Sequence, residues 1–132
     1  MPGIGPVIAA ALVACLTTKR FTHPDQFVAY LGLDIRTHQS GRRQAPGRLS
    51  KHGDAALRRL LFVAALAASR SQKDRTFATR YRREQAKGLA PTAALNAVAR
   101  KLAKLAWSMV THATPYDPTR VDTQPYSGLR QA

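Results

Sequence analysis

The amino-acid sequence predicts an all-α fold, a small helical domain that carries one long basic loop. Apolar residues recur at spacings of three and four in several segments, which is the period of an α-helix. Proline stands where such segments begin and glycine where they end, and these positions suit helix termini. The chain has 132 residues, which is enough for one domain with one modest core.

The first half of the chain contains two helical segments. The first is expected over about 6–17, and the second over about 24–31, where Gly32 ends it. From Leu33 to Gly53 the periodicity gives way to Gly, Pro, Ser, Gln and Arg. A loop of this length inside a compact domain is uncommon and is often functional.

Three further helices are expected in the second half. Asp54 has the side chain of an N-cap and opens a helix over about 54–71. Its predicted apolar face consists of Leu57, Leu60, Leu61, Ala64, Ala67 and Ala68. A basic helix is expected over about 74–87, where Gly88 ends it. This basic stretch is open to two interpretations, a solvated face or a nucleic-acid surface, and its few acidic residues favour the second.

The last helix is expected over about 91–111. Its apolar repeat consists of Leu95, Val98, Leu102, Leu105 and Met109. Its opposite side is expected to carry Arg100, Lys101 and Lys104. The apolar stripes of the 54–71 and 91–111 helices should pack on each other and on the first helix. Residues 1–112 are therefore expected to form the domain, and the proline-containing residues 113–132 an extended tail.

The charge of the chain indicates a polyanionic partner. There are 21 Lys and Arg residues against 7 acidic ones, for a formal net charge of +14. Such an imbalance opposes compaction by self-repulsion, so it usually meets DNA, RNA or an anionic surface. The longest strongly apolar run, Leu60 to Ala68, is far shorter than a bilayer requires. No membrane association is therefore expected, and the single Cys15 suits a reducing cytoplasm.

The sharpest local signal is the sequence PGIGPVIAAAL at 2–12, in which two glycines flank Ile4 and lead into a helix. Glycine lets the backbone approach a ligand, and the first amides of the following helix favour an anion. The pattern resembles the hairpin of a helix-hairpin-helix motif, in which Gly3, Ile4 and Gly5 would contact DNA phosphates. The first helix of that motif is expected to be truncated, because Met1 already lies in the hairpin. The alternative is a Gly-rich turn before a core helix.

A second signal is an ordered set of short motifs. The motifs are LGL at 31–33, HQSGRR at 38–43, GRLSKHGD at 47–54, LRR at 57–59 and TPYD at 114–117. Together with the PGIG hairpin, their order and spacing resemble the C-terminal domain of the insertion-sequence one-ten family of transposases, which includes related site-specific DNA invertases. The resemblance covers nearly the whole chain, and the ordered set is far more specific than any one motif.

The resemblance implies a DNA recombinase with two catalytic parts. An N-terminal RuvC-like domain would hold Mg²⁺ with four acidic residues, and the C-terminal domain would supply a serine that attacks a DNA phosphate. That serine lies in the SG pair and carries over to Ser40. The acidic residues of this chain are scattered, so the chain is expected to bind no metal and to lack the RuvC-like domain.

The residues around Ser40 suit phosphoryl transfer. A serine hydroxyl needs assistance to act as a nucleophile, and the developing oxyanion needs positive charge. His38 is the nearest residue that could act as a base. The residues expected to bind DNA phosphates, in addition to the hairpin, are Arg36, Arg42, Arg43, Arg48, Ser50, Lys51, Arg58 and Arg59.

The expected partners follow from the same resemblance. They are double-stranded DNA, a guide RNA encoded by the element, a RuvC-like domain or full-length transposase, and a second copy of the chain. The expected location is the bacterial cytoplasm, at the nucleoid. Two alternatives stay open: a non-catalytic helix-hairpin-helix module that binds DNA, and a small RNA-binding protein.

Overall fold

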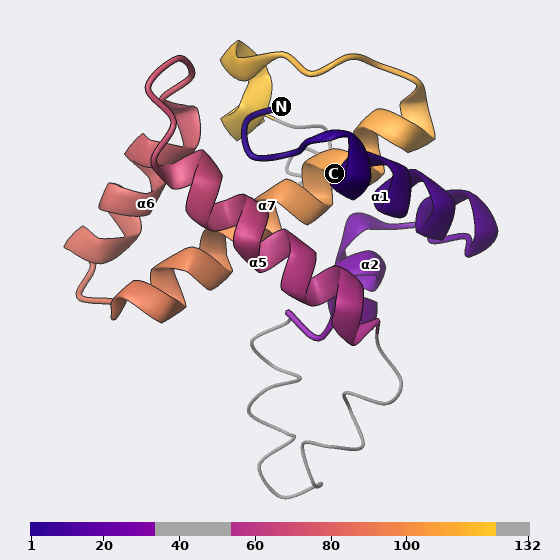
Figure 1. Ribbon diagram of the computed structural model, residues 1–132, viewed down its shortest axis with the longest axis horizontal. Coiled ribbons are helices and arrows are strands. Elements are labelled where there is room, and N and C mark those ends of the chain that lie inside the picture. Colours follow the sequence, from indigo (N-terminus) through magenta and orange to yellow (C-terminus); the bar gives the residue numbers. More distant parts are fainter. Residues whose placement is uncertain (34–53, 124–132) are drawn as a thin grey trace, which may run out of the picture.

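The computed structural model describes residues 1–33 and 54–123, and every regular element in these ranges is helical. The elements are α1 (Pro6–Thr18), α2 (Pro24–Leu31), α5 (Ala55–Ser69), α6 (Thr76–Ala86), α7 (Pro91–His112) and the 3-10 helix η1 (Pro118–Thr123). The all-α prediction is confirmed, and the α-helices begin and end within a few residues of the predicted positions (Figure 1).

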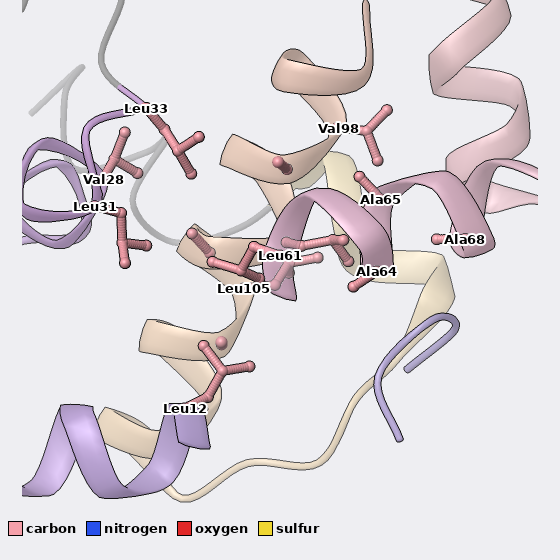
Figure 2. Packing of buried hydrophobic residues seen from close by; sticks show 14 of the residues in the cluster. Leu12, Val28, Leu31, Leu33, Leu61, Ala64, Ala65, Ala68, Val98 and Leu105 are labelled. Carbon is pink, nitrogen blue, oxygen red and sulfur yellow. The ribbon is translucent and has the colours of Figure 1, made fainter. Parts of the chain in front are cut away.

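Helix α7 is the centre of the fold. Helices α1, α2, α5 and α6 all pack against it, and α5 lies across its middle (Figure 1). Leu61 of α5 and Val98 and Leu102 of α7 are fully buried where these two helices meet, and Figure 2 shows Leu105 beside Leu61. The predicted pairing of the two apolar stripes is therefore confirmed.

The burial of two helix faces differs from the prediction. Lys101 was expected on an exposed side of α7, but it is only 7% exposed. The reason is that α2 and α6 pack against α7 in addition to α5, so more than one side of α7 is covered. Lys101 also lies four residues before the buried Leu105, so it flanks the apolar stripe instead of lying opposite it. On α5, Ala65 is buried in place of the predicted Ala67, which is exposed.

The N-terminal hairpin packs directly on α5. Gly3 adopts a φ of +82°, a conformation that favours glycine. A Cβ atom at Gly3 would lie 2.3 Å from the carbonyl oxygen of Ala64, so only glycine allows the two backbones to come this close. Ile4 packs against the core beside the hairpin, and Leu12 of α1 is buried. The hairpin and α1 are thus part of the packed domain.

The chain after α7 returns to the domain. The segment predicted to be an extended tail contains η1, and Val121 within it is buried. The hydroxyl group of Tyr116 donates a hydrogen bond of 2.6 Å to Oδ2 of Asp74, in the connection between α5 and α6. Among the described helices, none is both long enough and apolar enough to cross a bilayer.

Candidate nucleic-acid interface

The two helices that flank residues 34–53 are joined to each other by a hydrogen bond. The Arg58 side chain donates from Nη1 to the carbonyl oxygen of Leu31 at 3.0 Å, which ties the first turns of α5 to the end of α2. Gly32 ends α2 with a φ of +79°, and a Cβ atom there would lie 2.6 Å from the same Nη1. At the start of α5, Oδ1 of Asp54 accepts a hydrogen bond from the amide of Leu57 at 2.9 Å, which confirms the predicted N-cap.

Most of the predicted site lies in this connecting segment. Ser40, His38 and the predicted phosphate ligands of the loop lie outside the described residues. Those ligands are Arg36, Arg42, Arg43, Arg48, Ser50 and Lys51. Their predicted roles stay predictions, while the fold fixes where the segment leaves and rejoins the domain.

The described part of the predicted site divides into buried and exposed members. Gly3 and Ile4 face α5 and the core, whereas Gly5 is exposed, caps α1 with its backbone and has open space around its α-carbon. Arg58 is half-buried and bonded to Leu31, whereas the neighbouring Arg59 is exposed. Gly5 and Arg59 are therefore the two exposed residues in the described part of the predicted site.

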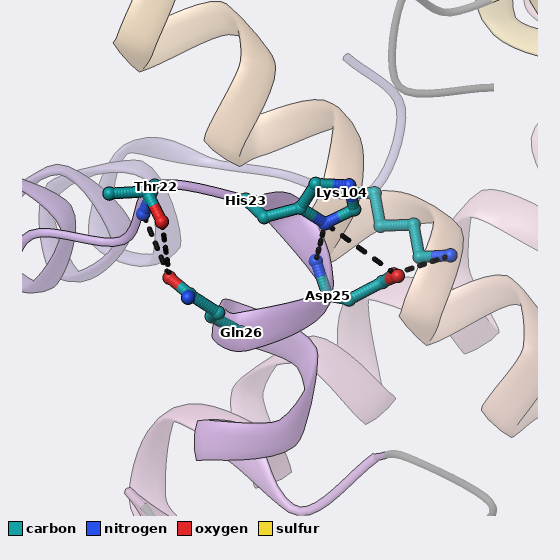
Figure 3. Close-up of polar contacts among 5 residues, drawn as sticks. All are labelled: Thr22, His23, Asp25, Gln26 and Lys104. Atoms are coloured by element: carbon teal, nitrogen blue, oxygen red, sulfur yellow. Dashed lines mark hydrogen bonds and ion pairs between the residues drawn. The ribbon is translucent and has the colours of Figure 1, made fainter. Parts of the chain in front are cut away.

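Two of the described acidic side chains make intramolecular ion pairs. Asp25, at the start of α2, lies between His23 and Lys104, with its Oδ1 3.2 Å from the ammonium group of Lys104 (Figure 3). Glu84 of α6 has a side chain that is only 10% exposed, and its Oε2 lies 3.3 Å from Nζ of Lys87. In both pairs the carboxylate is already matched by a cation of the chain.

The other three acidic side chains whose positions are described accept internal hydrogen bonds. Asp54 caps α5, and Asp117 accepts from the backbone and hydroxyl group of Thr119. Asp74 accepts from Thr76 and Tyr116. Burial by itself would raise the pKa of the Asp74 carboxyl, but these hydrogen bonds outweigh it and hold the pKa below its ordinary value.

Cations dominate the exposed surface as a result. The exposed basic residues of the described ranges are Lys19, Arg20, Arg59, Arg70, Lys73, Arg75, Arg82, Arg83 and Lys87. Six of these nine lie on α6 or on the residues that flank it, from 70 to 87. Asp74 and Glu84 are the acidic residues of this stretch that could offset its charge, but in the fold Glu84 is buried and Asp74 is half-buried and hydrogen-bonded.

The described residues contain no group of acidic, His or Cys side chains that could hold a metal ion. Cys15 is half-buried, and burial, followed by the charge of Asp54, raises the pKa of its thiol. A thiol with a raised pKa is a weak nucleophile at neutral pH.

Comparison with known proteins relates the chain to transposases. The sequence model of the Transposase IS116/IS110/IS902 family matches residues 1–82. A Pseudomonas aeruginosa protein named "Probable family 20 transposase" is 36% identical over 121 residues, which cover 88% of this chain and 35% of that protein. A Sinorhizobium fredii protein named "Putative transposase y4pF/y4sB" is 31% identical over 121 residues, covering 88% and 31%. The chain spans about a third of the length of these curated relatives. No solved structure matches it.

Proposed function

The chain belongs to the IS116/IS110/IS902 family of transposases, and on that premise we propose that it binds double-stranded DNA and supplies Ser40 as the nucleophile of DNA strand exchange. The DNA-binding part and the catalytic part of this proposal have different support.

The unbalanced positive charge of the surface supports DNA binding. The chain carries a formal charge of +14, and the five acidic side chains with described positions are engaged in internal contacts. Arg59 and Arg82 are exposed, and within residues 1–33 and 54–121 neither forms an ion pair with an acidic side chain. Phosphate contacts of this kind release counterions and give most of the affinity of sequence-independent DNA binding.

The SG pair in its basic context supports the catalytic role of Ser40. In the proposed step the hydroxyl oxygen of Ser40 bonds to the phosphorus of a DNA phosphodiester, and the bond from phosphorus to a deoxyribose oxygen breaks. That oxygen takes up a proton and remains on the cut strand as a hydroxyl group. Arg42 and Arg43 follow Ser40 at two and three residues and would stabilise the charge that develops on the phosphate. The hydroxyl proton must pass to a base, and arginine is unsuited to that role because it does not lose its proton.

His38 is the nearest residue of the chain that could act as a base, but the family resemblance implies a metal-bearing domain, so we place the activation of Ser40 outside this chain. Metal ions commonly activate the nucleophile and stabilise charge in phosphoryl transfer. An acidic RuvC-like domain elsewhere in a complete transposase would hold Mg²⁺, and a guide RNA would direct the complex to its DNA. The chain by itself would then bind DNA but neither cleave nor join it.

Salt dependence tests the DNA-binding part. If about six phosphates are neutralised, a plot of log K against log salt has a slope near about −5. The measurement is the fluorescence anisotropy of a labelled duplex of mixed sequence from low to physiological salt. An affinity that is indifferent to salt, or no binding at low salt, would refute this part.

A covalent-adduct assay tests the catalytic part. The chain is mixed with a RuvC-like domain from a close relative, Mg²⁺, the guide RNA of that relative and its cognate DNA. A protein–DNA adduct is expected with the wild-type chain and with Ser50→Ala, and none with Ser40→Ala. Duplex binding should be nearly equal in all three proteins, because one hydroxyl group contributes little beside so many cations. An adduct that survives Ser40→Ala would refute the assignment.

A further inference from the structure

We propose that α6, together with the turn that leads into it, is a second contact surface for the backbone of duplex DNA, separate from the segment 34–53. The residues that carry it are Arg70, Lys73, Arg75 and Arg82. This inference rests on the proposed function, because it assigns a surface to the DNA binding inferred above.

One face of α6 is buried against the domain, and the other is exposed and basic. Phe77 and Ala78 are buried, and Tyr81 packs against the core, so this side of the helix faces α5 and α7. On the other side Arg75 and Arg82 are exposed at the two ends of a span of two helical turns. Seven residues of helix correspond to about 10 Å along the axis. The backbone of Arg82 belongs to this packed helix, and Arg75 is its N-cap residue, with Nη1 donating to Oε1 of Gln72 at 3.3 Å.

The side chain at the centre of this outer face of α6 is short. Thr79 lies between Arg75 and Arg82 on the helix surface and is exposed. A short side chain at this position leaves room for a phosphate to approach the helix between the two cations. In the preceding turn, Arg70 and Lys73 are exposed as well. The four positive charges therefore lie along one element and the turn that opens it.

The acidic residues of this region do not cancel that charge. Glu84 is nearly buried, and Lys87, with which it pairs, keeps a side chain that is 61% exposed. Asp74 is engaged by Tyr116 and by the amide of Thr76. Glu84 is buried and Asp74 is half-buried, so both carboxylates are less exposed than the four cations.

The chemistry of the surface favours a duplex over a single strand. Proteins that bind single-stranded nucleic acid stack its bases on aromatic side chains. Within residues 1–33 and 54–123, every aromatic side chain is buried or half-buried, and α6 presents only Tyr81, which packs against the core. Contacts to phosphates alone suit a double helix, whose bases are already stacked and paired.

Helix α6 lies at the far end of α5 from Asp54, the first described residue after the segment 34–53. The segment 34–53 rejoins the fold at the first turn of α5, and α6 follows the last turn of the same helix (Figure 1). Helix α5 has 15 residues, which correspond to about 22 Å. A DNA contact at α6 would therefore lie about one length of α5 away from Asp54.

The test compares two double variants of the full chain with equal changes in charge. Arg75→Gln with Arg82→Gln removes two cations from α6, and Lys19→Gln with Arg20→Gln removes two exposed cations after α1. The α6 pair is expected to reduce the slope of log K against log salt by about 1.8, the value for two lost phosphate contacts. It should also weaken duplex binding about tenfold or more, while the control pair changes affinity less than about threefold.

A second pair of variants tests the same surface without removing a residue of the cluster. Thr79→Glu introduces a carboxylate between Arg75 and Arg82, and Thr79→Gln has nearly the same shape without the charge. The first is expected to weaken duplex binding at least fivefold, and the second less than twofold. Thermal unfolding of each variant checks that the fold is intact, as expected for exposed positions.

The outcomes separate this inference from the proposed function. A wild-type chain that does not bind duplex DNA would refute both. Wild-type binding with equal effects of the α6 and control pairs, and no difference between the two Thr79 variants, would refute the α6 surface alone. A parallel titration with duplex RNA completes the test: α6 variants that weaken RNA binding but leave DNA binding unchanged would assign the surface to RNA and overturn the proposal.

Discussion

The guanidinium group of Arg58 donates to the carbonyl oxygen of Leu31 at 3.0 Å, across 27 positions of sequence. The bond joins the start of α5 to the last residue of α2, and these are the elements that flank the segment 34–53. It also satisfies a carbonyl group that a helix end leaves without an intrahelical partner. Arg58, which the sequence motif predicts to bind a DNA phosphate, therefore joins the two helices that flank the segment 34–53.

We expect Arg58 and Arg59 to behave differently when each is replaced by alanine. Arg58→Ala removes the bond to Leu31 and should lower the free energy of unfolding by about 1–3 kcal/mol. Arg59→Ala removes an exposed side chain and should change it by less than about 0.5 kcal/mol. Urea denaturation measures both values. Equal costs would contradict the structural role of Arg58.

Replacement by alanine should cost more stability at Gly3 than at Gly5, the two glycines of the hairpin. Gly3→Ala places a Cβ atom against the backbone of Ala64 in a conformation with positive φ, and we expect a cost of about 1–3 kcal/mol or more. Gly5→Ala meets nothing within 4 Å and should cost less than about 1 kcal/mol. Thermal unfolding distinguishes the two variants. If the hairpin binds phosphate, Gly5→Ala should alter DNA affinity while the fold stays intact.

Truncation of the core where α5 meets α7 should be costly. Leu61 and Leu102 are fully buried, so replacement of either by alanine should lower the free energy of unfolding by about 2–5 kcal/mol. Val63 on the same helix α5 is 54% exposed and is the control. Val63→Ala should cost less than about 1 kcal/mol. A similar cost at all three positions would mean that the core lies elsewhere.

The contact between Asp74 and Tyr116 should make part of the stability depend on pH. The pKa of Asp74 is lowered in the folded state, so its contribution is complete above the unfolded value of about 3.9 and is lost as the pH falls through the folded pKa. Tyr116→Phe should cost about 1–2 kcal/mol at pH 7 and progressively less below pH 4. Tyr81→Phe is the control, since no hydrogen bond of its hydroxyl group is found in residues 1–33 and 54–123. A cost of Tyr116→Phe that is constant from pH 7 to pH 2 would contradict the prediction.

The sequence by itself determined the helices and the family. Local signals placed the helix ends, because Asp54 caps α5 through a bond within one turn and Gly32 adopts the positive φ that ends α2. Helical periodicity identified Leu61 and Leu102 as core residues, since the spacing of apolar residues depends only on the geometry of the helix. The ordered motifs identified the family for the same reason, because they are read directly from the order of residues in the chain.

Tertiary structure alone decided which charged residues face outward. The sequence could not predict that Lys101 is buried, because that depends on how many helices surround α7. Nor could it predict that Arg58 contacts Leu31 or that Asp74 contacts Tyr116, since these partners lie 27 and 42 positions away. Periodicity assigns one apolar face to each helix, whereas the pairing of polar groups follows from how the helices are packed together. The basic surface of α6 emerges only once that packing has turned Glu84 and Asp74 inward.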